Sequence, residues 1–441
     1  MPESLAIRGA TIITMDDDRT VIPEGIVVIE GGRFAAVEPG LRDPKADRLI
    51  DGRGQVLLPG LINCHMHTRP GRALGDGLSL FEWHALYPDN LCRIMTPEDS
   101  RAGGLVAFAE SLKGGTTTAI DMTCKPSGAV AAAEEIGIRA VIVPLAADAD
   151  RADGGACDAY QEVLPAIAAE VPRLARGRVQ YWLGFDAING VGEPTLRQMS
   201  EDARRLDVGI HGHMSESQVD TAWAPKTLGI DPAAYLARAG ILGPRTILAH
   251  CNWLTDDEIR LLASSRTSVS HNPTSNMKLG TGVCPVAALQ RAGVNVGLGT
   301  DGMLSNFHLD MFEVMRGACM LQRIHHLDAA ALSSWQALEM ATRGGARAVG
   351  LGDELGAITT GRRADAILVN FDQVHLRPRL RDAHDNLVAL LVWCAHGSDV
   401  TTVLVDGRVV VEGRRLTTIP EQRIARQVQE SAERLVARIA L

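Results

Sequence analysis

Histidines and one aspartate stand at the ends of apolar, strand-like runs in the middle of the chain. His65 and His67 close the first run, and in an extended segment this spacing turns both imidazoles to the same side. Later runs end in His211 and His213, His250, His271 and Asp301. An isolated His-x-His pair is often incidental, but recurrence at successive strand ends is not. Imidazoles with a carboxylate form a donor set suited to Zn²⁺ or Fe²⁺, so the pattern predicts a divalent metal site.

The elements that would bring these residues together are alternating strands and helices. The apolar runs are 56–64, 116–122, 139–145, 179–185, 208–213, 246–250, 268–271 and 294–300. Helical stretches separate them, which is typical of a parallel sheet with crossover helices. The number and spacing of the units predict a (β/α)8 TIM barrel, whose active-site residues lie at the carboxyl ends of the strands.

The two ends of the chain have a different texture, with short β-prone runs and glycine turns. The runs are 6–15, 25–30 and 33–37 near the start, and 365–370, 400–406 and 408–412 near the finish. Each end alone has too few strands to bury a face. We therefore expect residues 1–58 and 362–418 to form one small β-sandwich beside a barrel of residues 59–361.

The last segment, 419–441, is expected to be an amphipathic helix packed on the body or on a second subunit. Its apolar positions at helical spacing are Ile424, Val428, Leu435 and Ile439. We expect a homo-oligomer.

The composition of the chain limits the classes of molecule that we expect the protein to bind. The 441 residues are 46% hydrophobic with a net charge of -9, and basic residues do not gather into runs. This argues against nucleic acid or a membrane surface and favours a small-molecule partner. The start of the chain does not resemble a signal peptide, and no window approaches the ~20 apolar residues of a membrane span. The eight scattered cysteines form no CxxC pair, so we expect reduced thiols in a cytoplasmic protein.

Several motifs, taken in order, resemble those of the amidohydrolase superfamily. They are GLINCHMHT at 60–68, HMSE at 213–216, LAHC at 248–251, SHNPTSNMKLG at 270–280, GTDG at 299–302 and LGAITTGRRADAILV at 355–369. The branch that they resemble contains adenosine-like, guanine and cytosine deaminases and triazine chlorohydrolases. The resemblance covers nearly the whole chain.

The resemblance implies a ligand set for one metal ion, with zinc favoured and iron as the alternative. The four implied ligands are His65, His67, His213 and Asp301. A binuclear version of the family needs a lysine on the fourth strand, and this strand, VQYWLGFDAI, has none. We therefore expect a mononuclear site, which disfavours a dihydroorotase- or hydantoinase-like ring opener. His211 is assigned a supporting role, and His271 is left outside the catalytic set.

The same resemblance implies hydrolytic deamination. A divalent ion lowers the pKa of its water to about 7. Glu216 takes a proton from that water and delivers it to a ring nitrogen, while His250 hydrogen-bonds the attacking oxygen. Asp301 passes the remaining proton to the departing amine, so ammonia leaves. The expected substrate is a small aminated nitrogen heterocycle of purine, pterin, pyrimidine or triazine type.

Four residues are candidate substrate contacts, and three of them have an ordinary alternative. Trp83 belongs to an aromatic stretch that forms either a lid or part of the core. Ser305 and Asn306 follow Asp301 and either touch substrate or cap a helix. Asp186 stands where deaminases of S-adenosylhomocysteine or methylthioadenosine have a histidine.

These departures shape the expected substrate. Pro144, Leu145 and Ala146 occupy the loop where an arginine could meet a substrate carboxylate, and we identify no basic cluster near the strand ends. We therefore expect a free base to be preferred over a nucleoside. Three other interpretations stay open: displacement of chloride or an alkylamine from a triazine-like ring, deamination of S-adenosylhomocysteine or methylthioadenosine, and a metal-free scaffold that merely keeps the barrel.

Overall fold

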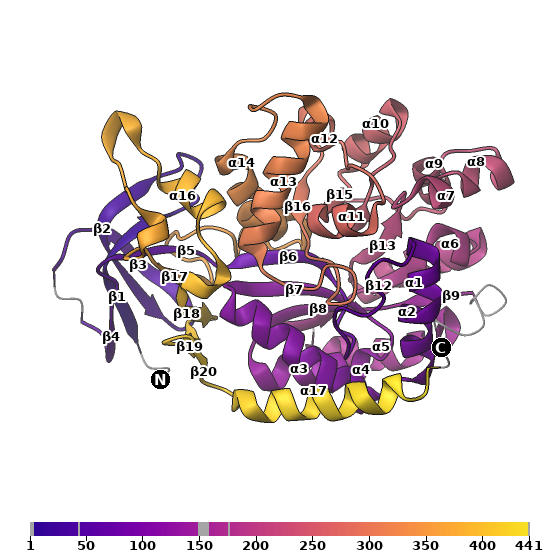
Figure 1. Ribbon diagram of the computed structural model, residues 1–441, viewed down its shortest axis with the longest axis horizontal. Coiled ribbons are helices and arrows are strands. Elements are labelled where there is room, and N and C mark those ends of the chain that lie inside the picture. Colours follow the sequence, from indigo (N-terminus) through magenta and orange to yellow (C-terminus); the bar gives the residue numbers. More distant parts are fainter. Residues whose placement is uncertain (1–3, 43–44, 149–157, 175–176, 440–441) are drawn as a thin grey trace.

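The computed structural model describes residues 4–42, 45–148, 158–174 and 177–439. Figure 1 shows a β-sheet built from both chain ends at one side, a barrel beside it, and the long helix α17 (Glu421–Val436) running along the barrel's outer surface. Parallel strands alternate with helices through the barrel, which confirms the expected fold class.

The barrel strands form two parallel ladders that meet edge to edge. In chain order they are β6 (Leu61–Met66), β7 (Thr116–Thr123), β8 (Arg139–Pro144), β11 (Val179–Tyr181), β12 (Leu183–Ala187), β13 (Ile210–Met214), β14 (Thr246–His250), β15 (Ser268–His271) and β16 (Val296–Leu298). The ladders run β11-β8-β7-β6 and β12-β13-β14-β15-β16. The Asp301 amide donates to the His65 carbonyl at 2.9 Å, which links the end of β16 to β6.

Helices wrap the barrel and build its rim. The covering helices are α3 (Pro97–Lys113), α4 (Pro126–Ile136), α5 (Tyr160–Leu174), α6 (Glu193–Leu206), α9 (Pro232–Arg238), α10 (Asp256–Ser265), α12 (Val286–Arg291), α13 (Met311–His326) and α14 (Ser334–Glu339). Shorter helices on the loops are α1 (Leu80–Leu86), α2 (Pro88–Ile94), α7 (Gln218–Thr221), α8 (Trp223–Leu228), α11 (Pro273–Leu279) and α16 (Leu387–Trp393).

Two of the expected barrel strands are interrupted. The run 56–64 divides at Gly60 into β5 (Gln55–Pro59), which belongs to the terminal sheet, and β6. A Cβ at Gly60 would lie 2.0 Å from Thr117 Oγ1, so only glycine allows this close approach. The fourth run divides at Trp182, whose amide still donates to the Ile142 carbonyl at 3.0 Å. A continuous apolar pattern gives no sign of either break.

The two chain ends pair in one sheet, as expected. Its other strands are β1 (Leu5–Ile13), β2 (Val21–Glu30), β3 (Arg33–Pro39), β4 (Arg48–Asp51), β17 (Ala366–Asn370), β18 (Val400–Val405), β19 (Arg408–Glu412) and β20 (Arg415–Leu416). The order is β20-β19-β18-β17-β5-β1-β2-β3, with β4 beside β1. β5 joins the two ends because it is antiparallel to β17 and parallel to β1. The boundaries at which the chain divides into separate units remain a prediction.

Helix α17 packs on α3 of the same chain. Ile424 is buried, Leu435 and Ile439 are buried in a cluster with Leu91 of α2, and Val428 is half-buried. The Asp99 carboxylate, which also caps the start of α3, accepts a hydrogen bond from Ser431 Oγ at 2.6 Å and pairs with Arg434. The C-terminal helix was expected to pack either on the body of its own chain or on a second subunit. It packs on the body of its own chain.

The expectation of reduced thiols is wrong for one pair. Cys92 on α2 and Cys124 after β7 form a disulfide with a Cα–Cα distance of 5.4 Å. They lie 32 residues apart in the sequence, so spacing could not show that the fold brings them together. Among the described residues, Cys64, Cys251, Cys284, Cys319 and Cys394 are free, and Cys157 lies outside that part of the chain.

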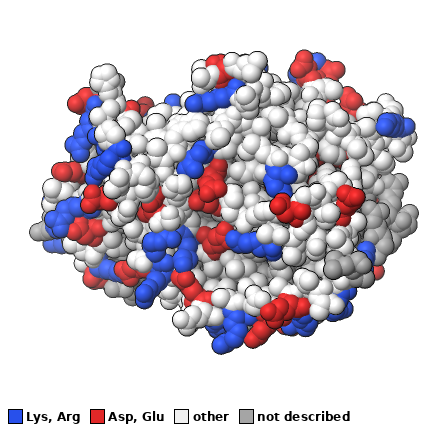
Figure 2. All heavy atoms as spheres, viewed as in Figure 1, with Lys and Arg blue, Asp and Glu red and all other residues white. Residues whose placement is uncertain are grey.

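Charged side chains of both signs are mixed on the face drawn in Figure 2. Such a surface produces no extended field of one sign on that face. In the described part of the chain, no helix is both long and apolar enough to cross a membrane.

Candidate active site

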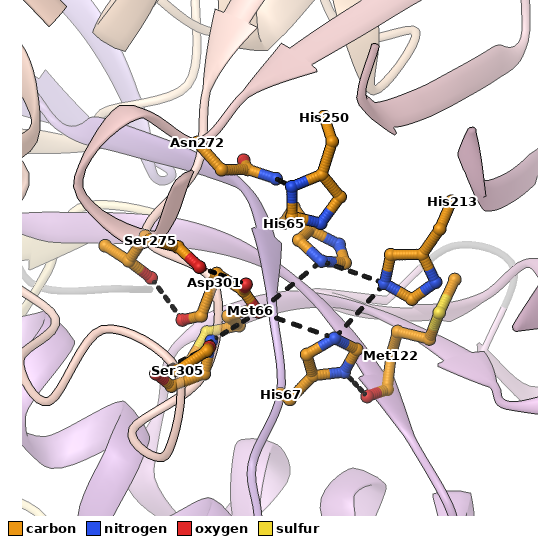
Figure 3. A network of polar contacts seen from close by, with 12 residues as sticks. His65, Met66, His67, Met122, His213, His250, Asn272, Ser275, Asp301 and Ser305 are labelled. Carbon is orange, nitrogen blue, oxygen red and sulfur yellow. Dashed lines mark hydrogen bonds and ion pairs between the residues drawn. The ribbon is translucent and has the colours of Figure 1, made fainter. Parts of the chain in front are cut away.

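A cavity of about 350 Å³ opens at the carboxyl ends of the barrel strands. His67, His213, Glu216, His250 and Asp301 line its floor, and Figure 3 shows the imidazoles and the aspartate turned toward one another from different strands. The structure therefore brings together the residues that the sequence placed at separate strand ends.

Sharp backbone turns aim several of these side chains. Ser215, His250 and Asp301 have φ values of 51°, 70° and 59°, in the left-handed region that non-glycine residues rarely adopt. Each lies directly at or beyond a strand end. Such strained positions persist where the surrounding structure fixes them, and they cluster at functional sites.

Backbone carbonyls fix the ring orientation of two histidines. Nδ1 of His67 donates to the Met122 carbonyl at 2.7 Å, and Nδ1 of His213 donates to the Asp186 carbonyl. A carbonyl can only accept, so Nδ1 carries the proton in both rings. In the neutral form, Nε2 of each ring then presents a lone pair to the cavity.

A third ring is oriented by another histidine. Nδ1 of His211 donates to the Ile247 carbonyl at 2.8 Å, so Nε2 of neutral His211 is an acceptor. That Nε2 lies 2.8 Å from Nδ1 of His65, which must therefore donate. Nε2 of His65 is left with a free lone pair. His211 thus positions His65, consistent with the supporting role expected for it.

The three free lone pairs converge. Nε2 of His213 lies 3.2 Å from Nε2 of His65 and 3.3 Å from Nε2 of His67. Asp301 Oδ1 lies 3.5 Å from His67 Nε2 and 3.7 Å from His65 Nε2. Lone pairs at this separation repel one another, and a cation among them removes the repulsion. The donor set therefore fits a divalent metal ion of the zinc type.

The pKa shifts of His65, His67 and Asp301 also favour metal binding. Burial, together with the neighbouring imidazoles, lowers the pKa of His65 well below its ordinary value. Burial also lowers the pKa of His67, and the nearby Arg69 charge adds to this shift. For Asp301, burial alone would raise the pKa, but His67, His250 and a hydrogen bond from Ser275 outweigh it and lower the pKa to about 2. Neutral imidazoles and an ionised carboxylate are the metal-binding forms.

Glu216 and His250 face each other beside this cluster. His250 Nδ1 lies 2.9 Å from Asn276 Oδ1, which makes Nδ1 the donor and turns Nε2 toward the cavity. That Nε2 lies 3.9 Å from Glu216 Oε1. Burial lowers the pKa of His250, but the charges of Glu216 and Asp301 outweigh burial and raise it. The pair can hold and exchange a proton within the cavity.

The expected substrate contacts have different positions. Trp83 and Ser305 line the cavity, and Trp83 Nε1 donates to the Leu74 carbonyl at 3.1 Å. Asp186 also lines it, with Oδ1 3.6 Å from His213 Nδ1. Asn306 is not among the lining residues, and its side-chain amide donates to the His308 carbonyl at 2.9 Å. Three of the four candidates thus face the cavity.

Sequence reasoning missed several polar lining residues. Arg69 follows β6, His84 lies on α1, Asp89 lies on α2 and Asp220 lies on α7. Asp220 binds the backbone amide of Glu216 at 3.0 Å. Arg69 follows His67 by two residues, a spacing that could have marked it.

Among the described residues, no hydrogen bond assigns a role to His271. The ring is fully buried, and neither nitrogen has a hydrogen-bond partner among the described residues. Burial lowers its pKa to about 3.

Comparison with known proteins agrees with this geometry. The model of the amidohydrolase family matches residues 56–410, and the chain belongs to this family. A 5-methylthioadenosine/S-adenosylhomocysteine deaminase of Acetivibrio thermocellus is 35% identical, covering 98% of this chain and 100% of the relative.

Two solved structures extend the likeness. An adenosine deaminase from Xanthomonas campestris with bound zinc has a TM-score of 0.91 at 28% identity over 98% of both chains. Atrazine chlorohydrolase from Arthrobacter aurescens, complexed with zinc, has a TM-score of 0.88 at 26% identity, covering 97% of this chain and 100% of that one. The family resemblance and the hydrolase class predicted from the sequence are confirmed.

Proposed function

We propose that the protein is a mononuclear metal-dependent deaminase that replaces the exocyclic amino group of a nitrogen heterocycle with oxygen. The observation that carries the proposal is the convergence of three imidazole lone pairs and the Asp301 carboxylate beside Glu216 and His250. Zinc is the proposed metal, because the donors are three nitrogens and one oxygen and both solved relatives described above contain zinc.

Four residues would hold the ion: His65, His67, His213 and Asp301. A divalent ion bound there would make water a nucleophile near neutral pH. Glu216 reaches the cavity from the turn after β13, where it takes the proton of the attacking water and donates it to a ring nitrogen. This protonation removes aromatic stabilisation at the carbon that bears the amine.

The remaining steps use His250 and Asp301. His250 Nε2 hydrogen-bonds the attacking oxygen, since Nδ1 is committed to Asn276. Asp301 Oδ1 accepts the second proton of the water and passes it to the departing amine, while Ser275 and the Gly302 amide hold the carboxylate in place. Water and the amine are consumed, and the oxo heterocycle and ammonia are released.

Two substrate types are compatible with the proposal. Relatives named as methylthioadenosine and S-adenosylhomocysteine deaminases favour a nucleoside. Asp186, which faces the cavity, favours a base whose amino groups can donate to it. A second candidate function, displacement of chloride or an alkylamine from a triazine, is favoured by the atrazine chlorohydrolase structure.

One screen tests the function. The zinc-loaded protein is incubated with free purines, pterins, pyrimidines and triazines and with adenosine, methylthioadenosine and S-adenosylhomocysteine, and ammonia, amine and chloride are measured. We expect ammonia from at least one aminated ring. Release of chloride alone would establish the second candidate, and no product from a metal-loaded protein would overturn both.

A homo-oligomer also remains part of the proposal. Met320 and Ile324 on α13 and Leu327 directly after it are 54%, 68% and 87% exposed. An apolar stripe of this kind is typical of a protein contact. Light scattering should give a mass of at least two chains.

A further inference from the structure

Arg69 is a buried cation at the wall of the cavity. It is 8% exposed, follows His67 by two residues and lines the cavity. Its Nε donates to Cys92 Sγ at 3.2 Å. Among the described residues, no hydrogen bond or ion pair engages its two terminal nitrogens. Burying a guanidinium without partners costs free energy, so this position calls for a partner from outside the chain.

The neighbouring acids are occupied elsewhere. Asp89 Oδ1 lies 2.8 Å from His84 Nδ1. Buried Asp121 accepts hydrogen bonds from the amide and hydroxyl of Thr68 at 3.0 and 2.6 Å. Burial raises the pKa of Asp121 to about 7 although the Arg69 charge opposes this shift. Among the described residues, no hydrogen bond or ion pair joins Asp121 to Arg69, since both carboxylate oxygens are engaged by Thr68.

The acids that β12 and α7 contribute to the lining are also engaged. Asp186 lies against His213, and Asp220 accepts from the amides of Glu216 and Ser217. The lining therefore differs in charge along the chain. The stretch from β6 to α2 supplies Arg69, whose terminal nitrogens have no partner among the described residues, and Asp89, which His84 engages, whereas β12, the turn after β13 and α7 supply only carboxylates as charged groups.

We propose that Arg69 determines substrate specificity by receiving a negatively charged or carbonyl oxygen of the substrate. The preferred substrate is then an aminated heterocycle that carries a carboxylate or a ring oxo group toward the β6–α2 segment and its amino donors toward Asp186. This inference rests on the proposed deaminase function. A guanidinium fork binds such oxygens in a fixed plane and more strongly than a neutral donor does. The sequence-based expectation that no basic cluster lies near the strand ends did not consider a single buried arginine such as Arg69.

Matched substrate pairs test the proposal. The carboxylate arm compares pterin-6-carboxylate with pterin and adenosine-5′-carboxylate with adenosine; the oxo arm compares guanine with 2-aminopurine. For the parent, kcat/KM should favour the oxygen-bearing member of at least one pair by about ten- to a hundredfold, the range of a charge-assisted hydrogen bond. Arg69→Gln should abolish that preference, and Arg69→Lys should keep part of it.

Arg72→Gln is the matched control. Arg72 lies three residues further on, is not a lining residue and pairs with Glu110 on α3. This variant should keep the parent's preference. A purely structural role for Arg69 predicts instead that Arg69→Gln lowers the melting temperature or slows all substrates equally. An unchanged preference ratio in Arg69→Gln overturns the proposal.

A binding measurement separates this inference from the proposed function. Benzoate and benzamide are titrated calorimetrically into the zinc-loaded parent, Arg69→Gln and Arg72→Gln. Benzoate can also meet the metal, but that contribution is common to all three proteins. We expect benzoate to bind the parent and Arg72→Gln about tenfold or more tightly than Arg69→Gln, and benzamide, whose oxygen is neutral, to be affected less. Equal benzoate affinities overturn the role of Arg69 even if deamination is observed, whereas a clear difference without deamination supports Arg69 and contradicts the proposed function. Should Arg69→Gln fail to fold, Arg69→Lys carries the same comparisons.

Discussion

The floor of the cavity differs from its rim, by which we mean the lining residues after β6 and on α1 and α2, in how far the protein engages the polar side chains. On the floor, His65, His67 and His213 have their outer ring nitrogens committed to the protein, so only the inner nitrogens remain available. On the rim, Arg69 keeps its terminal nitrogens uncommitted within the described structure, and Phe81 is 56% exposed.

This contrast separates two tasks. The floor stands on barrel strands whose hydrogen bonds fix its geometry, as a reaction centre requires. The rim stands on a loop and two short helices, where a substitution changes which molecule is held without moving the metal donors. We therefore expect changes on the floor to abolish turnover and changes on the rim to redirect it.

The largest effect should follow removal of a proposed metal ligand. His65→Ala deletes one of four donors and one converging lone pair, so metal content should fall from about one ion per chain toward zero. Turnover should fall to background. Elemental analysis and an ammonia assay measure both, with the exposed His326→Ala on α13 as control. Two ions per parent chain would contradict a mononuclear site.

Glu216→Gln tests the floor without disturbing its metal donors. The amide keeps the side-chain shape but cannot shuttle a proton, so kcat should fall by about 10²–10⁴-fold while metal content stays constant. The exposed Glu201→Gln should retain full activity. Activity within a few-fold of the parent would exclude Glu216 as the shuttle, and loss of metal would make it a ligand.

His211 offers a graded test of how strictly the floor is oriented. His211→Ala leaves Nδ1 of His65 without its acceptor, and losing such a supporting bond typically weakens metal affinity about 10–100-fold. His211→Asn provides an acceptor again and should restore part of the affinity. Competition with a chelator measures it. Equal affinities in all three proteins would show that the ring of His65 needs no such support.

The smallest effect concerns the rim and depends on pH. Burial lowers the pKa of His84, but the hydrogen bond and charge of Asp89 outweigh burial, so the folded pKa lies above the unfolded value. The stabilisation is therefore complete below about pH 6.5, the unfolded pKa, and is lost as pH rises through the folded pKa. His84 is partly exposed, so the effect should be below about 1 kcal/mol.

Denaturant unfolding of the parent and His84→Gln at a series of pH values measures this difference. The gap in unfolding free energy between the two proteins should shrink as pH rises. A gap that grows with pH would show that Asp89 does not stabilise the charged ring.

The floor was predictable because its signal is local. His-x-His after an apolar run, and single histidines or aspartate at later run ends, identify both the strand and the side of the barrel. The (β/α)8 pattern and the pairing of the chain ends followed from the same reading of apolar runs.

The features that the sequence did not predict depend on distances between residues that are far apart along the chain. Gly60 breaks a run because Thr117 approaches it, and Cys92 meets Cys124 because α2 lies over the end of β7. The importance of Arg69 comes from what its neighbours are already bound to, since an arginine on a loop is ordinarily a solvated charge. Its position beside His67 was visible, but the absence of partners for its terminal nitrogens within the described part of the chain was not.

Gly60 also has a thermodynamic consequence. It is the only residue between β5, at the centre of the terminal sheet, and β6, which carries His65. The sheet therefore has no linker on which to swing, and pulling β5 from its place would drag two metal donors with it. An ion that binds only the folded floor then stabilises the distant sheet by mass action. By the same linkage, packing of the chain ends would raise the affinity for the proposed ion, although none of the proposed ligands lies in the terminal sheet.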